Sequence, residues 1–187
     1  MNKSEFKVAL VCGPNSDLEA VALRASLEYF GARVFPYWIG RPYDLIDVLS
    51  GEGLYEGTDH IVFSFHGDEG KLVMPELGEE VYEEDEPRED FGPEQIVRFA
   101  KLKGKVVLGN GCTLGENALA QAFLDGGCTA YIGPNDYVDG NSALMFATRF
   151  YYELIQNKKT VEEAFALAKA MDEETSMYQL FTSTASA

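Results

Sequence analysis

Two short stretches of the chain combine a reactive side chain with glycine, and each follows an apolar run. His66 and Gly67 come directly after the apolar residues 61–65, and Cys112 lies in the glycine-rich segment 109–115, after a second apolar run. Because such runs are typical of buried strands, both side chains are predicted at strand ends. The carboxyl ends of parallel strands form the sheet edge where ligand sites are built. The two stretches therefore predict a histidine and a cysteine at one edge of a sheet.

A cysteine and a histidine in this arrangement can perform nucleophilic catalysis. The thiolate is the nucleophile, and a base within hydrogen-bond reach can take the proton of the thiol. We therefore interpret Cys112 as the nucleophile and His66 as the base. Acyl transfer also needs donors aimed at the developing oxyanion, and the backbone N–H groups of Gly67 and Cys112 are candidates.

The other two cysteines and the other histidine lack this setting. Cys12 and Cys128 have no matching glycine context, so we interpret both as core residues. His60 begins the apolar run that leads to His66, which places it at the opposite edge of a parallel sheet, in a structural role. Taken alone, Cys112 or His66 could also be an ordinary structural residue. Their joint placement beside glycine favours the catalytic interpretation.

Sequence order and spacing argue against several other kinds of site. Class I glutamine amidotransferases place the partner histidine after the cysteine, and no histidine follows His66 here. The few histidines and cysteines lack the spacing of zinc ligands. The first apolar run leads into residues 12–15 (Cys-Gly-Pro-Asn), which do not match the glycine pattern of a dinucleotide site. A flavodoxin-like binding protein would need a phosphate-cradling loop, and none is evident. We expect neither a metal site nor a cofactor.

Apolar runs alternate with amphipathic segments along the chain, which predicts βαβ units. Strands are expected at 7–12, 33–38, 60–65, 105–108 and 128–132, with a small hairpin strand at 71–73 and a short edge strand at 178–181. Helices are expected at about 16–30, 42–49, 114–125, 142–156 and 160–171. Two of them begin with a capping box, Ser16 with Glu19 and Thr160 with Glu163. The chain is expected to be one α/β domain over 1–187, a three-layer α/β/α sandwich with a mostly parallel sheet.

The chain carries a formal net charge of −16 at pH 7. A negative surface of this size repels a phosphate backbone and anionic membranes, so we expect no nucleic acid and no membrane partner. The charge either serves solubility alone or favours basic partners and substrates. No apolar run could span a bilayer, and the first residues show no secretory pattern. With three cysteines at unrelated spacings, these features predict a reduced, cytoplasmic protein.

One segment, at about 75–92, departs from the alternation of strands and helices. It is a dense acidic run broken by prolines, with too few apolar residues to fold alone. As an insertion between the histidine strand and the cysteine strand, it is expected to hang over or beside the site. It is either a solvated loop or an acidic rim or lid that attracts basic substrates. Its clustered carboxylates make calcium binding a property to check.

The two motifs resemble those of the caspase-like cysteine peptidase clan, which includes caspases, metacaspases, legumain, separase, gingipains, clostripain and bacterial CHAT domains. His66-Gly67 ends one strand, and residues 110–115 (Asn-Gly-Cys-Thr-Leu-Gly) end the next, in the order that this clan uses. Residues 122–134 and 150–168 are similar to the elements after the cysteine in gingipain-like and CHAT members. The resemblance covers roughly residues 59–172.

The resemblance implies a caspase-like fold and a cysteine endopeptidase with a His66–Cys112 dyad, an oxyanion hole that includes Gly67, and no cofactor. A peptide or protein substrate is implied, and the negative charge of the chain favours a basic one. Because caspase relatives often pair edge to edge, the resemblance also allows a homodimer. The alternative is a caspase-like domain that no longer cleaves peptides and acts as a binding or regulatory module.

The sequence departs from some members of the clan at one substrate-binding position. Metacaspases and clostripain have an aspartate two residues before the cysteine that helps to bind a basic side chain, and this chain has Asn110 there. Another carboxylate, Asp136 or Asp139, would then have to contact a basic substrate. The caspase pattern around the cysteine is absent, so aspartate specificity is not implied.

Overall fold

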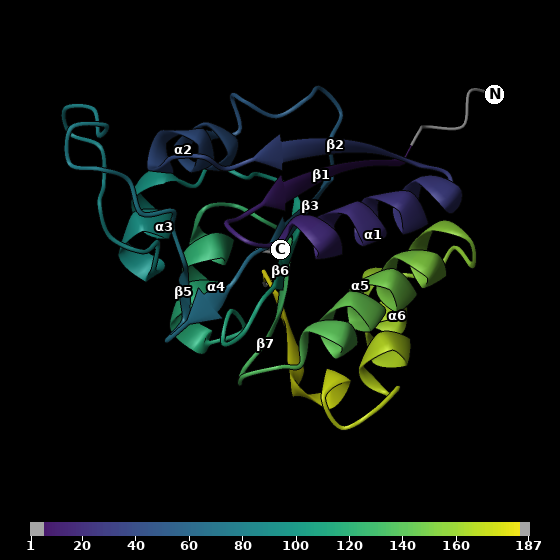
Figure 1. Cartoon of the computed structure of the whole chain (residues 1–187). Coiled ribbons are helices and arrows are strands. Elements are labelled where there is room, and N and C mark those ends of the chain that lie inside the picture. Colours follow the sequence, from purple (N-terminus) through teal and green to yellow (C-terminus); the bar gives the residue numbers. More distant parts are fainter. Residues whose placement is uncertain (1–5, 184–187) are drawn as a thin grey trace.

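Six strands form one central sheet in the order β2-β1-β3-β6-β7-β8 (Figure 1). The computed structural model describes residues 6–183. β8 runs antiparallel to β7 at one edge, where the short edge strand was expected, and the other five strands are parallel. The expected α/β class with a mostly parallel sheet is confirmed. The strands are β1 (Phe6–Cys12), β2 (Ala32–Trp38), β3 (His60–Ser64), β6 (Val106–Asn110), β7 (Ala130–Pro134) and β8 (Tyr178–Thr182).

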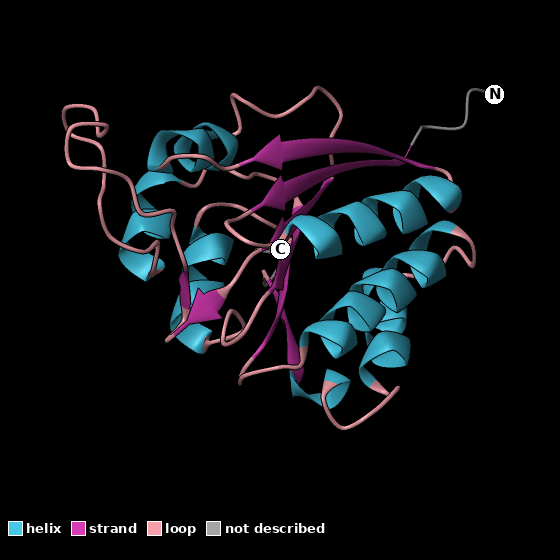
Figure 2. Cartoon of the chain, viewed as in Figure 1, coloured by secondary structure: helices cyan, strands magenta, loops and turns pink. Residues whose placement is uncertain are grey.

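Helices cover both faces of the sheet, so the molecule has three layers (Figure 2). One face carries α2 (Pro42–Ser50), α3 (Pro93–Phe99) and α4 (Asn117–Asp125). The other face carries α1 (Asp17–Tyr29), α5 (Gly140–Ile155) and α6 (Val161–Lys169). The hairpin of β4 (Gly67–Asp68) and β5 (Lys71–Leu72) follows β3, and the short 3₁₀ helix η1 (Thr175–Met177) precedes β8.

Successive residues of the central strands belong to two separate cores. Ile61 and Phe63 of β3 pack with residues of α2, α3 and α4, whereas Val62 between them packs with residues of α1, α5 and α6. All three side chains are fully buried. Because both faces of the sheet are covered, the strand is apolar at every position rather than at alternate positions. This explains why apolar runs alone located the inner parallel strands.

The two expected capping boxes have different outcomes. At the start of α6, the Thr160 hydroxyl accepts from the Glu163 N–H (3.2 Å), and the Glu163 carboxylate accepts from the Thr160 N–H (3.0 Å), so this box is confirmed. At the start of α1 the box is wrong. The Ser16 hydroxyl donates to the Gly13 carbonyl oxygen (2.8 Å), and the Glu19 side chain turns toward the sheet.

Two further expectations differ from the structure for identifiable reasons. α4 begins at Asn117 rather than at Leu114, because the chain turns first and the Gly115 N–H donates to the Pro134 carbonyl oxygen (2.7 Å). α3 is a helix that the pattern did not predict. It has seven residues, with Pro93 in its first turn and only Ile96 buried. One buried side chain leaves no helical periodicity to detect.

The acidic insertion is held against the N-terminus of α2. Arg41 donates to the Glu86 carboxylate from Nε (3.0 Å) and from a terminal nitrogen (2.6 Å), and the Tyr43 N–H donates to the same carboxylate (3.0 Å). The Glu86 side chain is fully buried, and the hydrogen bond from Arg41 lowers the pKa of Glu86 to about 2. In Figure 1 the insertion extends past α2 and α3. It therefore lies beside those two helices as an attached segment.

Candidate active site

β3 and β6 are neighbours in the sheet, and their carboxyl ends lie at one edge. Ser64 and Asn110, the last residues of the two strands, are in register. Just beyond them, the Phe65 N–H donates to the Asn110 carbonyl oxygen (3.4 Å). His66 and Cys112 each follow two residues after their strand end. The topology therefore brings the two segments that carry the candidate dyad together.

Glycine allows these two segments to touch backbone to backbone. A Cβ at Gly67 would lie 2.0 Å from the Cys112 carbonyl oxygen, and a Cβ at Gly111 would lie 2.1 Å from the Phe65 carbonyl oxygen. No side chain can occupy either position without moving the opposite backbone. The two glycines beside the reactive residues are therefore required for the close approach of the segments.

His66 and Cys112 line the same cavity, which has a volume of about 440 Å³. The His66 side chain is exposed, and Cys112 is half-buried. The Cys112 thiol donates to the Val138 carbonyl oxygen, with Sγ 3.6 Å from that oxygen. The cavity lies between the segment leading into α1 and the start of α5, and its other lining residues are Asn15, Ser16, Asp17, Leu18, Glu19, Phe65 and Gly140.

The remaining cysteines and the remaining histidine are buried elsewhere. Burial raises the pKa of the Cys12 thiol and of the Cys128 thiol to about 12, so both stay protonated at neutral pH. His60 packs against the rings of Phe6 and Tyr151, and burial lowers its pKa to about 4. Cys112 is thus the accessible thiol of the chain, and His66 is the accessible imidazole.

Glu19 is a site residue that the sequence argument missed. Its carboxylate accepts from the Ser64 hydroxyl (2.7 Å) and from the Asn110 amide (3.0 Å), and Asn110 in turn accepts from the Tyr178 hydroxyl (2.7 Å). Burial raises the pKa of Glu19, whereas these two hydrogen bonds and the nearby His66 lower it. The signal in the sequence was its position in the first turn after β1, at the same sheet edge. The capping-box spacing concealed it.

The three predicted substrate-binding residues make contacts of other kinds. Asn110 is 1% exposed, and its side-chain amide makes hydrogen bonds with Glu19 and with Tyr178. Asp139 caps α5 by accepting from the Asn141 N–H (2.9 Å). Asp136 is exposed, and its carboxylate accepts from the N–H of the next residue (2.7 Å). None of the three lines the cavity, and the carboxylates that line it within the described part of the chain are Asp17 and Glu19.

Thr113 connects the loops around the cavity by hydrogen bonds. This residue has a φ of 58°, a left-handed conformation that is rare for a β-branched side chain. Its N–H donates to the Asp136 carbonyl oxygen (3.0 Å), and its hydroxyl accepts from the Gly70 N–H (3.0 Å). The exposed Tyr137 also donates from its hydroxyl to Asp68 of the hairpin. The cysteine loop is thus fixed to the segments on both sides of it.

Within residues 6–183, no group of three or more histidine, cysteine, aspartate or glutamate side chains could hold a metal ion. This includes the acidic insertion, for which calcium binding was a property to check. In the same part of the chain, no helix is long and apolar enough to cross a membrane.

No protein-family model and no curated protein sequence matches this chain. Solved structures do match it in fold. Gingipain R of Porphyromonas gingivalis, an Arg-specific cysteine proteinase, superimposes with a TM-score of 0.62 at 12% identity, over 96% of this chain and 46% of that chain. A secreted C11 cysteine protease from Bacteroides thetaiotaomicron, in complex with an irreversible peptide inhibitor, gives 0.58 at 10% identity, over 95% and 66%.

Saccharomyces cerevisiae separase, in its complex with securin, matches with a TM-score of 0.60 at 11% identity, over 95% of this chain and 12% of that chain. The chain thus spans less than half of gingipain R and a small part of separase. At these identities the matches show the fold alone. The fold is caspase-like, as expected from the two motifs.

Proposed function

We propose that this protein is a cysteine peptidase in which Cys112 is the nucleophile and His66 is the general base and acid. The observation that carries this proposal is the shared cavity, in which the accessible thiol and the accessible imidazole of the chain lie at the carboxyl edge of β3 and β6. The caspase-like fold supports it, because the matched cysteine proteases have the same fold.

The reaction would proceed through a thioester. His66 takes the proton of the Cys112 thiol, and the sulfur attacks the peptide carbonyl carbon. The backbone N–H groups of Gly67 and Cys112 donate to the oxyanion of the tetrahedral intermediate. His66 then gives its proton to the leaving amine as the C–N bond breaks. Water, deprotonated by His66, hydrolyses the thioester and releases the acid product.

Glu19 would act as a positioning residue for His66. A partly buried carboxylate next to an imidazole favours its protonated form, which is the form that must protonate the leaving amine. The two hydrogen bonds from Ser64 and Asn110 hold the Glu19 carboxylate at the base of the cavity. In this proposal Asn110 contributes to the site through Glu19 rather than by contact with substrate.

The charges in the cavity favour a basic substrate side chain. Asp17 and Glu19 contribute two carboxylates to its lining, and among residues 6–183 no lysine or arginine lines it. Because the whole chain also carries a net charge of −16, a cationic peptide would be attracted at long range and again within the cavity. The matched gingipain R is Arg-specific, and we propose arginine or lysine before the scissile bond here as well.

Alkylation of Cys112 tests the dyad without any knowledge of the substrate. We expect iodoacetamide at about pH 6, where ordinary thiols are almost wholly protonated, to label native Cys112 at least about tenfold faster than the His66→Ala variant. His60 and the two buried cysteines provide internal controls, since His60→Ala should leave the rate unchanged and only one thiol should be labelled. Peptides with arginine or lysine would then be screened for cleavage.

Equal labelling rates in the native protein and in His66→Ala would remove the support for an activated thiol. The same cavity would then be interpreted as the ligand site of a catalytically silent binding module. Rapid labelling without cleavage of any basic peptide would retain the dyad but overturn the proposed substrate.

A further inference from the structure

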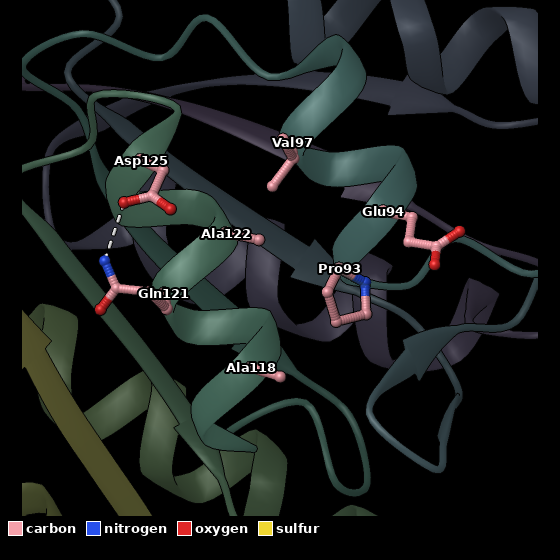
Figure 3. Close-up of a pocket in the computed structure, with 7 residues that line it drawn as sticks. All are labelled: Pro93, Glu94, Val97, Ala118, Gln121, Ala122 and Asp125. Atoms are coloured by element: carbon pink, nitrogen blue, oxygen red, sulfur yellow. Dashed lines mark hydrogen bonds between the residues drawn. The ribbon is translucent and has the colours of Figure 1, made fainter.

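A second cavity, of about 500 Å³, lies between α3 and α4. These helices cover the face of the sheet opposite to α1 and α5, which border the catalytic cavity. The lining of this cavity includes Pro93 and Val97 from α3 and Ala118 and Ala122 from α4. Figure 3 shows these side chains around the gap between the two helices. We call this cavity the α3–α4 groove.

The groove has the spacing that a third helix needs. Pro93 and Val97 are four residues apart on α3, and Ala118 and Ala122 are four residues apart on α4. Residues at this spacing lie on one face of a helix, so each helix contributes one apolar row. Val97 is 62% exposed, so its side chain is open to contact with a partner. Small side chains in both rows allow another helix to approach closely.

The rims of the groove and the cavity beside it are acidic. Glu94 and Asp125 are lining residues. In Figure 3 the Glu94 carboxylate points away from α4, whereas the Asp125 carboxylate lies along α4 and accepts from the Gln121 side-chain amide (2.8 Å). At the N-terminal end of α3, the groove continues into a cavity of about 490 Å³ that shares Pro93 and Glu94 with it. Glu89 and Asp90 also line this second cavity, and the cations near them include Lys71 in the lining and Arg98, whose charge acts on Glu89.

The acidic groups of the adjoining cavity are fixed in place by hydrogen bonds. Glu89 accepts from the Gln95 side-chain amide (2.9 Å), and Asp90 accepts from the Met74 N–H (2.8 Å). The rest of the acidic insertion leads into this position, and Glu86 ties it to Arg41. The insertion thus places carboxylates next to an apolar groove rather than over the catalytic cavity.

We propose that the α3–α4 groove and the adjoining acidic cavity bind an amphipathic, basic helix of a partner protein. Its apolar side chains would lie between the two apolar rows, and its lysine or arginine side chains would reach Glu89, Asp90 and Glu94. A second copy of this chain is a poor occupant, because it would bring the same acidic rims and a further net charge of −16. This proposal does not depend on peptidase activity.

Selection from a display library of random 16-residue peptides on the native chain identifies a ligand without assuming its sequence. We expect enriched peptides to be cationic, with apolar residues three or four positions apart. Fluorescence anisotropy with the labelled peptides should then show at least about tenfold weaker binding to Val97→Lys. Val21→Lys on α1 is the matched control, because Val21 is 60% exposed and lies outside the groove.

Peptide binding to alkylated protein distinguishes binding in the groove from binding in the catalytic cavity. Peptides in the groove should bind equally well after Cys112 is blocked with iodoacetamide, whereas peptides in the catalytic cavity should be displaced. Enriched peptides that are neutral or acidic, or that bind Val97→Lys as tightly as the native chain, would overturn the groove proposal. So would the absence of any enriched peptide, or self-association of the native chain that Val97→Lys abolishes.

Discussion

At the scale of single residues, Glu19 shows how a site can cost stability. Its carboxyl pKa is raised above its ordinary value of 4.5, mainly by burial. A carboxyl group with a raised pKa in the folded state stabilises the fold below pH 4.5, and this contribution is lost as pH rises through the folded-state pKa. At neutral pH the charged Glu19 therefore destabilises the protein in proportion to that shift, and we attribute its presence to function.

Glu19→Gln should accordingly stabilise the protein while lowering its peptidase activity. The glutamine carbonyl can still accept from Ser64 and Asn110, but no charge has to be buried. We expect the melting temperature of the variant to exceed that of the native protein at pH 7, and the difference to shrink as pH falls toward 4.5. Peptide cleavage should fall by about tenfold.

Thermal unfolding from about pH 4 to 8 measures the first effect, with Glu28→Gln as the matched control on the same helix. Glu28 is exposed, and its side chain pairs with Arg24 on the surface. A melting-temperature difference between Glu19→Gln and the native protein that does not vary with pH would show that burial of the Glu19 charge is not the cause of the difference.

Gly67 is both a proposed oxyanion-hole donor and the point where the two loops of the site touch. An added Cβ would lie 2.0 Å from the Cys112 carbonyl oxygen, so one of the two loops must move. We expect Gly67→Ala to lower the free energy of unfolding by about 1–3 kcal/mol, as overpacking does, and to abolish rapid alkylation of Cys112. Gly40→Ala is the matched control, since Gly40 is exposed, is not among the cavity's lining residues, and a Cβ there would lie at an ordinary contact distance of 3.5 Å from Asp44 Oδ2. Equal labelling in the two variants would contradict the close approach.

At the scale of elements, the buried Glu86 carboxylate is the centre of the contacts that attach the acidic insertion, and Arg41 also pairs with Glu83 (3.1 Å). Glu86 has a pKa of about 2 because Arg41 donates to it, so the attachment is complete above its ordinary value of 4.5 and is lost only as pH falls toward 2. We expect Glu86→Gln to release the insertion and to speed cleavage of residues 75–92 by an added protease at neutral pH.

Glu84→Gln is the control for that experiment, because Glu84 lies in the same segment with an exposed side chain. Limited proteolysis followed by mass spectrometry would report the sites cut. If both variants were cut as slowly as the native protein, the Arg41–Glu86 pair would not be what holds the insertion.

The strands that the sequence predicts most directly are those whose side chains are buried on both faces of the sheet. The inner parallel strands β1, β3, β6 and β7 are buried on both faces over most of their length, so each contains an apolar run that is followed by glycine or a polar residue. α3 has one buried residue, and the insertion is fixed by ion pairs and hydrogen bonds with residues 40 to 45 positions earlier, so neither leaves a local pattern. Glu19 was misread for the same reason, because its partners Ser64 and Asn110 are distant in the chain and only the sheet order brings them together.

At the scale of the whole molecule, the net charge of −16 should govern how charged reagents reach Cys112. Iodoacetate is an anion and iodoacetamide is neutral, yet both alkylate the same thiol. The negative field should keep iodoacetate away, and added salt should screen that repulsion as the Debye length falls to about 10 Å at 0.1 M and about 3 Å at 1 M.

We therefore expect salt to accelerate labelling by iodoacetate relative to labelling by iodoacetamide. Intact-mass kinetics at several salt concentrations would measure the ratio of the two rates. Asp17→Asn separates the local contribution from the global one, since it removes one carboxylate from the cavity and changes the net charge by a single unit. A salt-independent ratio in the native protein would mean that the net negative charge of the chain creates no repulsive field at Cys112. A basic substrate would then have to be selected by the carboxylates of the cavity alone.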